Sequence, residues 1–270
     1  GVTGLGTYPD GMVEHDGHVG QMLSLLKELG VENDTIVVYT TDNGAESFTW
    51  PDGGTTPFRG EKATNWEGGF RVPCAIRWPG TIKPGSVIND ICAHEDFLPT
   101  LAAAAGDTDV VDRIRKGGKI GDKAFKVHLD GNNLIPFFKG EQKESPREGF
   151  MYWSDDGDLM AVRVRHWKVN FLEQDTEISP RTPLGVWQGG FTVLRAPNLY
   201  NLRSDPFENG TDSIYYADWQ ARRAFLFVPA QAIVGKVLET FKEFPPRAKA
   251  ASFTVGDAME KMTTASPHQN

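Results

Sequence analysis

The sequence predicts an α/β fold in which a mixed, mostly parallel sheet is sandwiched by helices and followed by a small antiparallel β-sheet with a C-terminal helix. Residues 11–29 have apolar side chains at helical spacing and lead into an apolar, β-branched run over 35–40. The second half contains short strand-like segments separated by turn residues, and a helical pattern over 230–244 closes it. The order of these patterns predicts an α/β part followed by an antiparallel part with a C-terminal helix.

The first helix and the strand after it have clear boundaries. Asp10 is expected to cap the start of the helix, and Gly30 follows its last apolar residue, where glycine commonly ends a helix. Residues 35–40 are apolar and β-branched without alternation. Strands covered on both faces of a parallel sheet have this pattern, so we expect a central, buried strand here.

A long polar loop separates this strand from the next one. Residues 42–71 are glycine-rich and show almost no periodicity, and loops of this length in compact domains are usually functional or disordered. The next strand is predicted over 72–78, where Pro73 indicates an edge position or the start of a strand. A helix rich in Leu and Ala is expected over 96–105.

The charged, glycine-rich residues 107–148 are the expected domain junction. We predict an α/β domain over 1–145 and a small sheet-and-helix subdomain over 146–270. The subdomain is expected to contain short antiparallel strands over residues 150–153, 159–164, 167–172 and 198–202. Its tail from Arg247 onward is polar, and we expect it to be mobile.

Composition excludes several classes of function. Hydrophobic residues make up 39% of the chain, which is ample for a core. The formal net charge of −8 argues against a nucleic-acid partner or an anionic membrane, because both need a basic face. The two cysteines, Cys74 and Cys92, cannot build a disulfide framework or a four-thiolate zinc site. No uninterrupted apolar run approaches the roughly 20 residues of a membrane span.

Asp42 and Asn43 are candidate metal ligands because they follow the first predicted strand directly. Ligands of open α/β sheets bind beyond the carboxyl ends of strands. A carboxylate beside an amide oxygen suits Ca²⁺ or Mg²⁺. The alternative, which these residues alone favour, is an ordinary Asp-Asn-Gly turn.

Lys62 is a candidate anion-binding residue in the long loop. Its ammonium group offers three donors to an oxyanion, although an ordinary solvated lysine is the alternative. Gly68 and Gly69 would let the backbone turn sharply and approach a ligand closely.

Two other patterns are interpreted as having no role in the chemistry. Four polar residues on the first helix look like a metal cluster but are typical of a helix surface: Glu14, His15, Asp16 and His18. The glycosylation sequons at Asn33 and Asn209 are interpreted as chance matches unless a eukaryote secretes the protein.

Five ordered segments resemble the sulfatase family. Residues 12–29 resemble the helix before the family's metal strand, and 35–44 resemble that strand followed by Ser/Thr-Asp-Asn-Gly. Residues 60–73 resemble Gly-Lys-x-Thr-x-aromatic-Glu-Gly-Gly-x-Arg-x-Pro, with Glu61 inserted before Lys62. Two further matches are Asp-Phe-Leu-Pro-Thr-Leu at 96–101 and Leu-Tyr-Asn-Leu with Asp-Pro-Phe-Glu at 199–202 and 205–208. Together they cover most of the chain.

The resemblance implies an arylsulfatase-like sulfuric ester hydrolase of the alkaline phosphatase superfamily. Asp42 and Asn43 would be two ligands of one Ca²⁺, or of Mg²⁺ in some members. Lys62 would bind the sulfate group or its leaving oxygen. Trp50 and Trp66 flank these positions and would either line the substrate entrance or pack the loops. The expected substrate is a small sulfate ester or a sulfated carbohydrate.

The family's formylglycine nucleophile is made from Cys or Ser in Cys/Ser-x-Pro-x-Arg, and this motif is missing from the 270 residues. In the family's order it lies upstream of residue 1, together with the paired aspartates that complete the metal site. The resemblance therefore implies the C-terminal portion of a sulfatase, inactive by itself. We expect it to associate with the missing N-terminal part or with itself, because an apolar face would be uncovered.

Two alternatives stay open. A phosphomonoester or phosphodiester hydrolase of the same superfamily would use a similar metal and nucleophile on a phosphate ester. A catalytically inactive binding or scaffold module would explain the missing nucleophile. The compartment is unassigned, with a periplasmic or secreted location slightly favoured by the resemblance.

Overall fold

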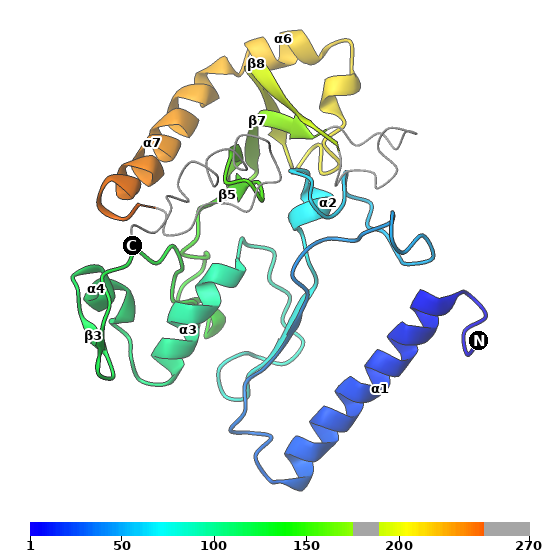
Figure 1. Cartoon of the computed structure of the whole chain (residues 1–270), viewed down its shortest axis with the longest axis vertical. Coiled ribbons are helices and arrows are strands. Elements are labelled where there is room, and N and C mark those ends of the chain that lie inside the picture. Colours follow the sequence, from blue (N-terminus) through cyan, green and yellow to red (C-terminus); the bar gives the residue numbers. More distant parts are fainter. Residues whose placement is uncertain (175–188, 246–270) are drawn as a thin grey trace, which may run out of the picture.

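The computed structural model describes residues 1–174 and 189–245. Figure 1 shows a long helix, α1, at one side, a central pair of strands with its loops, a group of short elements that includes α3 and α4, and a C-terminal sheet with a covering helix. The elements of the first half are α1 (Thr7–Glu28), β1 (Val37–Thr40), α2 (Glu67–Phe70), β2 (Cys74–Arg77), α3 (Phe97–Ala104), α4 (Val110–Arg115), β3 (Lys119–Ile120), β4 (Lys123–Ala124) and α5 (Ile135–Phe138). Those of the second half are β5 (Gly149–Trp153), β6 (Leu159–Val164), β7 (Trp167–Gln174), β8 (Phe191–Asn201), α6 (Tyr216–Ala221) and α7 (Phe227–Glu243).

The expected parallel sheet is not seen among the described residues. Strands β1 and β2 form a two-stranded antiparallel sheet in which Thr40 is opposite Cys74. Parallel pairing needs a crossover that carries the chain back along the sheet, whereas residues 41–73 form a loop that returns to the edge it left. The expectation of a buried strand is also wrong, because Val38 and Tyr39 are exposed. An apolar run does not by itself reveal which neighbours cover it.

Helix α1 is confirmed but begins earlier than the sequence predicted. It starts at Thr7, so Asp10 lies inside its first turn and Gly6 is at the N-cap. Gly30 has a left-handed φ of 70°, as expected after a helix end. None of the helix residues is buried, and most of its apolar side chains, such as Met22, are exposed. The helix meets the rest of the chain through Tyr8, which contacts Trp50, and His15, which contacts Tyr39, while most of its apolar surface stays exposed.

Helix α3 is tied to the start of the second half through Asp96. The Asp96 carboxylate is buried and accepts hydrogen bonds from the guanidinium group of Arg147, at 2.7 and 2.8 Å. It also accepts backbone hydrogen bonds from Ala93, at 2.8 Å, and Asn132, at 2.7 Å. Burial alone raises the pKa of Asp96, but these donors outweigh it and lower that pKa. The junction thus contains a satisfied buried ion pair.

The C-terminal sheet is antiparallel throughout, in the order β5-β6-β7-β8, which confirms the predicted texture of this half. Strands β7 and β8 are longer than predicted, and they pair from Trp167 with Asn201 to Gln174 with Phe191. Helix α7 lies along the sheet in Figure 1, and Ala230 packs on Leu199 and its neighbours on β6 and β7. This contact is the main core of the second half. The polar tail from Arg247 onward lies outside the described residues.

The stretch Ala224–Glu243, which contains α7, is the one helical segment among the described residues long and apolar enough to cross a membrane. Reasoning from uninterrupted apolar runs had not predicted it. One face of the helix packs on the sheet through Ala230, Ile233 and Val234. A helix that covers a sheet has the same length and composition, so the feature is weak evidence for a membrane.

Leu199→Ala is expected to lower the free energy of unfolding by about 2–5 kcal/mol, because Leu199 is 0% exposed beneath α7. The matched control is Val193→Ala on the same strand, where the side chain is 76% exposed and the expected loss is below about 1 kcal/mol. Urea unfolding followed by tryptophan fluorescence measures both. Equal losses for the two variants would contradict the assignment of the core.

Candidate functional site

The antiparallel pairing of β1 and β2 gathers the sequence-predicted site residues at one edge. Asp42 and Asn43 follow the end of β1, and residues 60–71 lead back to the start of β2. Because the end of one antiparallel strand adjoins the start of its partner, the two segments meet. The Thr40 hydroxyl donates a 2.9 Å hydrogen bond to the carbonyl of Pro73 and closes this edge.

Backbone contacts hold the two segments together. The amide of Gly44 donates to the carbonyl of Gly69 at 2.9 Å, and the amide of Lys62 donates to the carbonyl of Ala45 at 2.9 Å. A Cβ atom at Gly44 would lie 1.7 Å from the carbonyl oxygen of Gly68. Only glycine fits there, so this residue serves the approach of two backbones rather than a turn alone.

Asp42 is an ionised carboxylate held by local donors. Hydrogen bonds from its own backbone amide and from the Thr41 hydroxyl lower its pKa, and the positive charge of Lys62 adds to this. Its Oδ1 atom accepts from the backbone amide of Asn43 at 3.0 Å. The Nδ2 group of Asn43 donates to the carbonyl of Gly44 at 2.8 Å, so its Oδ1 oxygen is the amide atom suited to a cation.

The residues present fit part of a hard-cation site. Asp42 and Asn43 offer two oxygen ligands of the kind that Ca²⁺ and Mg²⁺ prefer, whereas Ca²⁺ takes about six to eight. Within residues 1–174 and 189–245, no group of three or more His, Cys, Asp or Glu residues could hold a metal ion. The remaining ligands would have to come from elsewhere. The four polar residues 14–16 and 18 on α1 are exposed and form no such group.

Lys62 lies next to an acidic residue that sequence reasoning missed. Its Nζ atom is 3.2 Å from Oε2 of Glu46, and its side chain is 43% exposed. The Thr49 hydroxyl donates to the other oxygen of Glu46 at 2.9 Å. The ammonium group thus faces solvent on one side and a fixed carboxylate on the other. Nothing local marks Glu46 in the sequence, because the contact depends on the fold of the loop.

The two tryptophans occupy different environments. Trp50 is 45% exposed, and its ring lies 5.9 Å from that of Tyr8. Trp66 is 0% exposed and packs edge-on against Tyr200, with the guanidinium group of Arg59 3.8 Å from its ring. In this structure Trp66 therefore packs the loop onto the C-terminal sheet and does not line an opening, which is the loop-packing alternative. Trp50 stays a prediction as a substrate-lining residue.

A buried cluster of charges lies behind the Lys62 loop. Lys168 on β7 is fully buried, and its Nζ atom lies 2.7 Å from Oε1 of Glu208 and 3.3 Å from Oε1 of Glu67. It also donates to the backbone carbonyl of Asn65 at 2.7 Å. Figure 1 shows α2, which begins at Glu67, directly against the C-terminal sheet. Sequence reasoning missed this cluster, since its members are more than 100 residues apart between loop and strand.

Glu67 is the most heavily paired carboxylate of the cluster. Its oxygens accept from the Tyr152 hydroxyl at 2.5 Å, from Arg163 at 2.9 Å and from Arg71 at 2.7 Å. Burial by itself raises the pKa of Glu67, but the charges of Lys168 and Arg163 and the hydrogen bonds outweigh it and lower the pKa to about 2. Burial raises the pKa of Glu208, and the charge of Lys168 offsets this only in part.

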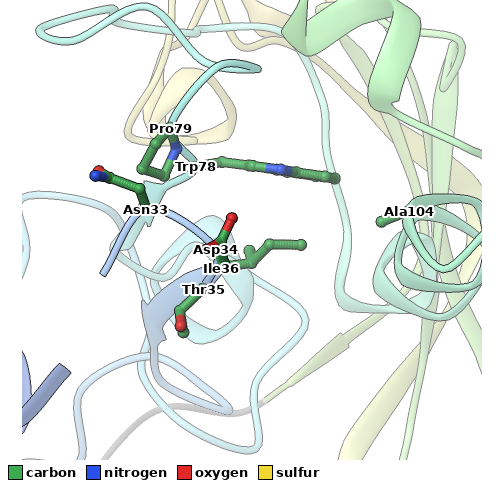
Figure 2. Close-up of a pocket in the computed structure, with 7 residues that line it drawn as sticks. All are labelled: Asn33, Asp34, Thr35, Ile36, Trp78, Pro79 and Ala104. Carbon is green, nitrogen blue, oxygen red and sulfur yellow. The ribbon is translucent and has the colours of Figure 1, made fainter. Parts of the chain in front are cut away.

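A separate cavity of about 280 Å³ lies between the approach to β1 and the end of β2. Figure 2 shows the Trp78 side chain extending across it toward Ala104, beside Ile36. Its lining includes Asp34 but no cationic side chain. An anionic ester would meet the Asp34 carboxylate and no cationic side chain there, so this cavity is not the candidate site.

Comparisons with known proteins point to one family. Residues 4–107, which include Asp42, Asn43 and Lys62, match the family model described as Sulfatase. Arylsulfatase A from Homo sapiens is 34% identical over 214 residues, which are 77% of this chain and 39% of that protein. Steryl-sulfatase from Mus musculus is 32% identical over 220 residues, 75% of this chain and 33% of that protein. The chain thus spans well under half the length of these relatives.

The fold is also similar to that of a sulfatase of known structure. A solved structure of the PsFucS1 sulfatase from Pseudoalteromonas sp. superimposes with a TM-score of 0.71 and 29% sequence identity. The match covers 89% of this chain and 44% of that chain. It extends well beyond the range of the family model, so the similarity includes the C-terminal sheet as well as the β1–β2 region.

Glu67→Gln is expected to lower the free energy of unfolding at pH 7 by about 3–5 kcal/mol, because it leaves the buried Lys168 short of a partner. The pKa of Glu67 in the folded chain, about 2, lies below its ordinary value of 4.5. Its contribution is therefore complete above pH 4.5 and is lost as pH falls toward 2. Urea unfolding between pH 7 and pH 3 should show the two proteins converging at acidic pH. The exposed Glu141→Gln is the control, and a constant difference across this range would contradict the assignment.

Proposed function

We propose that this chain, which belongs to the sulfatase family, forms one side of the active site of a sulfate-ester hydrolase. The family assignment covers the region that the chain shares with arylsulfatases and steryl-sulfatases. The observation that carries the proposal is the meeting of the Asp42–Asn43 pair with the Lys62 loop through the Gly44 and Lys62 backbone hydrogen bonds. An oxygen pair for a cation and an ammonium group for an anion are thereby held on adjoining segments. Both would act on the negative charge of a bound sulfate ester.

In this proposal Asp42 and Asn43 hold Ca²⁺ or Mg²⁺. Sulfatases are typically metal-dependent, and the bound ion would supply charge neutralisation at the sulfate oxygens. Lys62 would stabilise the negative charge that grows on the leaving alkoxide or phenoxide, where electrostatic help lowers the barrier. Its ammonium group is half-exposed, so a substrate can reach it from the solvent side. The displacing group would come from the rest of the protein.

The substrate class is a sulfate ester of a small aromatic molecule or of a carbohydrate. Trp50 supports both, because its half-exposed ring offers an apolar face for an aryl or sugar ring. The Trp50 amide donates to the backbone carbonyl of Glu46 at 3.3 Å, and the Glu46 side chain contacts Lys62. A ring stacked on Trp50 would therefore lie close to the proposed anion site.

The product of the complete gene is expected to hydrolyse nitrophenyl sulfate in preference to nitrophenyl phosphate, and this 270-residue chain alone is expected to show no turnover. In the complete product, Lys62→Ala should lower kcat by about 10²–10³-fold, because a donor to the developing oxyanion is lost. Lys83→Ala, at an exposed lysine outside the site, should leave kcat unchanged. Preference for the phosphate ester, or an upstream sequence without Cys/Ser-x-Pro-x-Arg, would count against the proposal.

We also propose that the exposed apolar face of α1 is covered in the assembled protein, by the remainder of a sulfatase core or by a second copy of this chain. Met22 and Leu29 on and beside this helix are exposed, and such surfaces promote association. Light scattering of the isolated chain is expected to show concentration-dependent association. Replacing both residues by Gln should reduce it, whereas the same changes at exposed polar sites should not. A clean monomer at all concentrations would contradict this.

A further inference from the structure

The segment behind Lys62 is a loop that is buried almost completely. Thr64, Asn65, Trp66 and Glu67 are all buried, although loops usually run over the surface. Buried backbone groups need hydrogen-bond partners, since unpaired ones are costly. The C-terminal sheet supplies several of these partners, which gives that sheet a direct effect on the conformation of the loop.

Lys168 is the central partner. Its ammonium group contacts the carbonyl of Asn65 and the carboxylate of Glu67 on the loop, and the carboxylate of Glu208 after β8. Glu208 completes the arrangement, because its Oε2 atom accepts a 2.7 Å hydrogen bond from the backbone amide of Glu67. Three polar groups of the loop are thus fixed by one lysine and one glutamate from the second half.

Asn65 adds a second attachment to the same strand. Its Nδ2 group donates to the carbonyl of Leu172 at 2.6 Å, and its Oδ1 atom accepts from the amide of Gln174 at 3.3 Å. Both partners belong to β7, the strand that carries Lys168. The loop is therefore attached to β7 at Lys168 and again near the end of the strand, which fixes its position along the strand and its orientation.

The contacts continue from the buried part of the loop to the proposed site. The amide of Gly69 donates to the carbonyl of Trp66, and the carbonyl of Gly69 accepts from the amide of Gly44, next to Asn43. On the other side, the Thr64 hydroxyl donates to the carbonyl of Glu61 at 2.7 Å, one residue before Lys62. A shift of Asn65 or Glu67 would displace both the cation pair and the ammonium group.

We propose that Lys168 and Glu208 are positioning residues of the site, which act through Glu67 and Asn65 to hold Lys62 in register with Asp42 and Asn43. Both residues act through protein contacts alone in this proposal. The inference builds on the proposed function, and it makes the C-terminal sheet a structural component of the anion and cation sites. Lys168 also lies 4.2 Å from the ring of Tyr152, so its ammonium group is enclosed by partners from the loop and the sheet.

Hydrogen–deuterium exchange of this 270-residue chain tests the inference in Lys168→Met, in the double variant Lys168→Met with Glu208→Gln, and in the control Lys236→Met. Lys236 is an exposed lysine on α7. The double variant removes both charges, which restores much of the stability lost when one partner of a buried pair is removed. It still removes the donor to Asn65 and Glu67.

For each protein we divide the exchange rates of amides in residues 42–46 and 60–70 by the rates in the β5–β6 pair. In both Lys168 variants we expect this ratio to be at least tenfold higher than in the unmodified chain. The control should match the unmodified chain. Equal acceleration in loop and sheet would mean general destabilisation and would overturn the inference. The inference would also be overturned if the loop amides of the double variant exchanged as slowly as those of the unmodified chain.

A second measurement separates this inference from the proposed function. Ca²⁺ alone and sodium sulfate alone are expected to slow exchange over residues 42–46 and 60–70 of the unmodified chain, with at least tenfold weaker responses in both Lys168 variants. If neither probe affects the unmodified chain, this side of the site does not bind the metal or the anion by itself, while the exchange rates without ligand still decide the role of Lys168. Full responses in the Lys168 variants would overturn the positioning role alone.

Discussion

The buried ammonium group of Lys168 imposes a constraint that organises much of the molecule. A charge removed from water needs close partners of opposite sign and hydrogen-bond acceptors, or the chain does not fold around it. The carboxylates of Glu67 and Glu208 and the carbonyl of Asn65 meet that need. They come from a loop of the first half and a turn of the second, so satisfying one lysine brings distant parts of the chain together.

The two halves of the chain depend on each other through this contact. The loop contributes Trp66 to a small core with Tyr200 and Leu202, and the sheet contributes the partners that allow the loop to be buried. On the opposite side of the loop, the close approach of Gly44 to Gly68 leaves no space for a side chain. The loop is therefore confined between the β1–β2 edge and the C-terminal sheet. The composition predicts a domain boundary near residue 145. The contacts between the loop and the C-terminal sheet cross that boundary, so it stays a prediction.

Local sequence patterns predicted the two longest helices and the C-terminal sheet of this structure, and they failed where contacts with distant residues decide the structure. The helical patterns over 11–29 and 230–244 and the short strand segments between turn residues identified α1, α7 and the four-stranded sheet, because such patterns are local. The same reasoning assigned residues 35–40 to a parallel sheet, because a continuous apolar run says nothing about strand direction. Placement after a strand singled out Asp42 and Asn43. Glu46 and Lys168 have no local signature, and a lysine in a strand normally faces solvent. Glu208 stands in the Asp-Pro-Phe-Glu segment, but that segment does not reveal its contact with Lys168.

The separation of α1 from the rest has a consequence for cooperativity. The helix has 22 residues and buries none of them, so packing adds little to its intrinsic helix stability. In proteins most helical stability comes from tertiary packing of an amphipathic face, and α1 has little such packing. Its helix–coil equilibrium is therefore expected to be largely independent of the C-terminal sheet, and heating should melt it gradually before the main transition. The chain then behaves as two thermodynamic units, and a midpoint measured by tryptophan fluorescence describes chiefly the second, because every tryptophan lies outside α1.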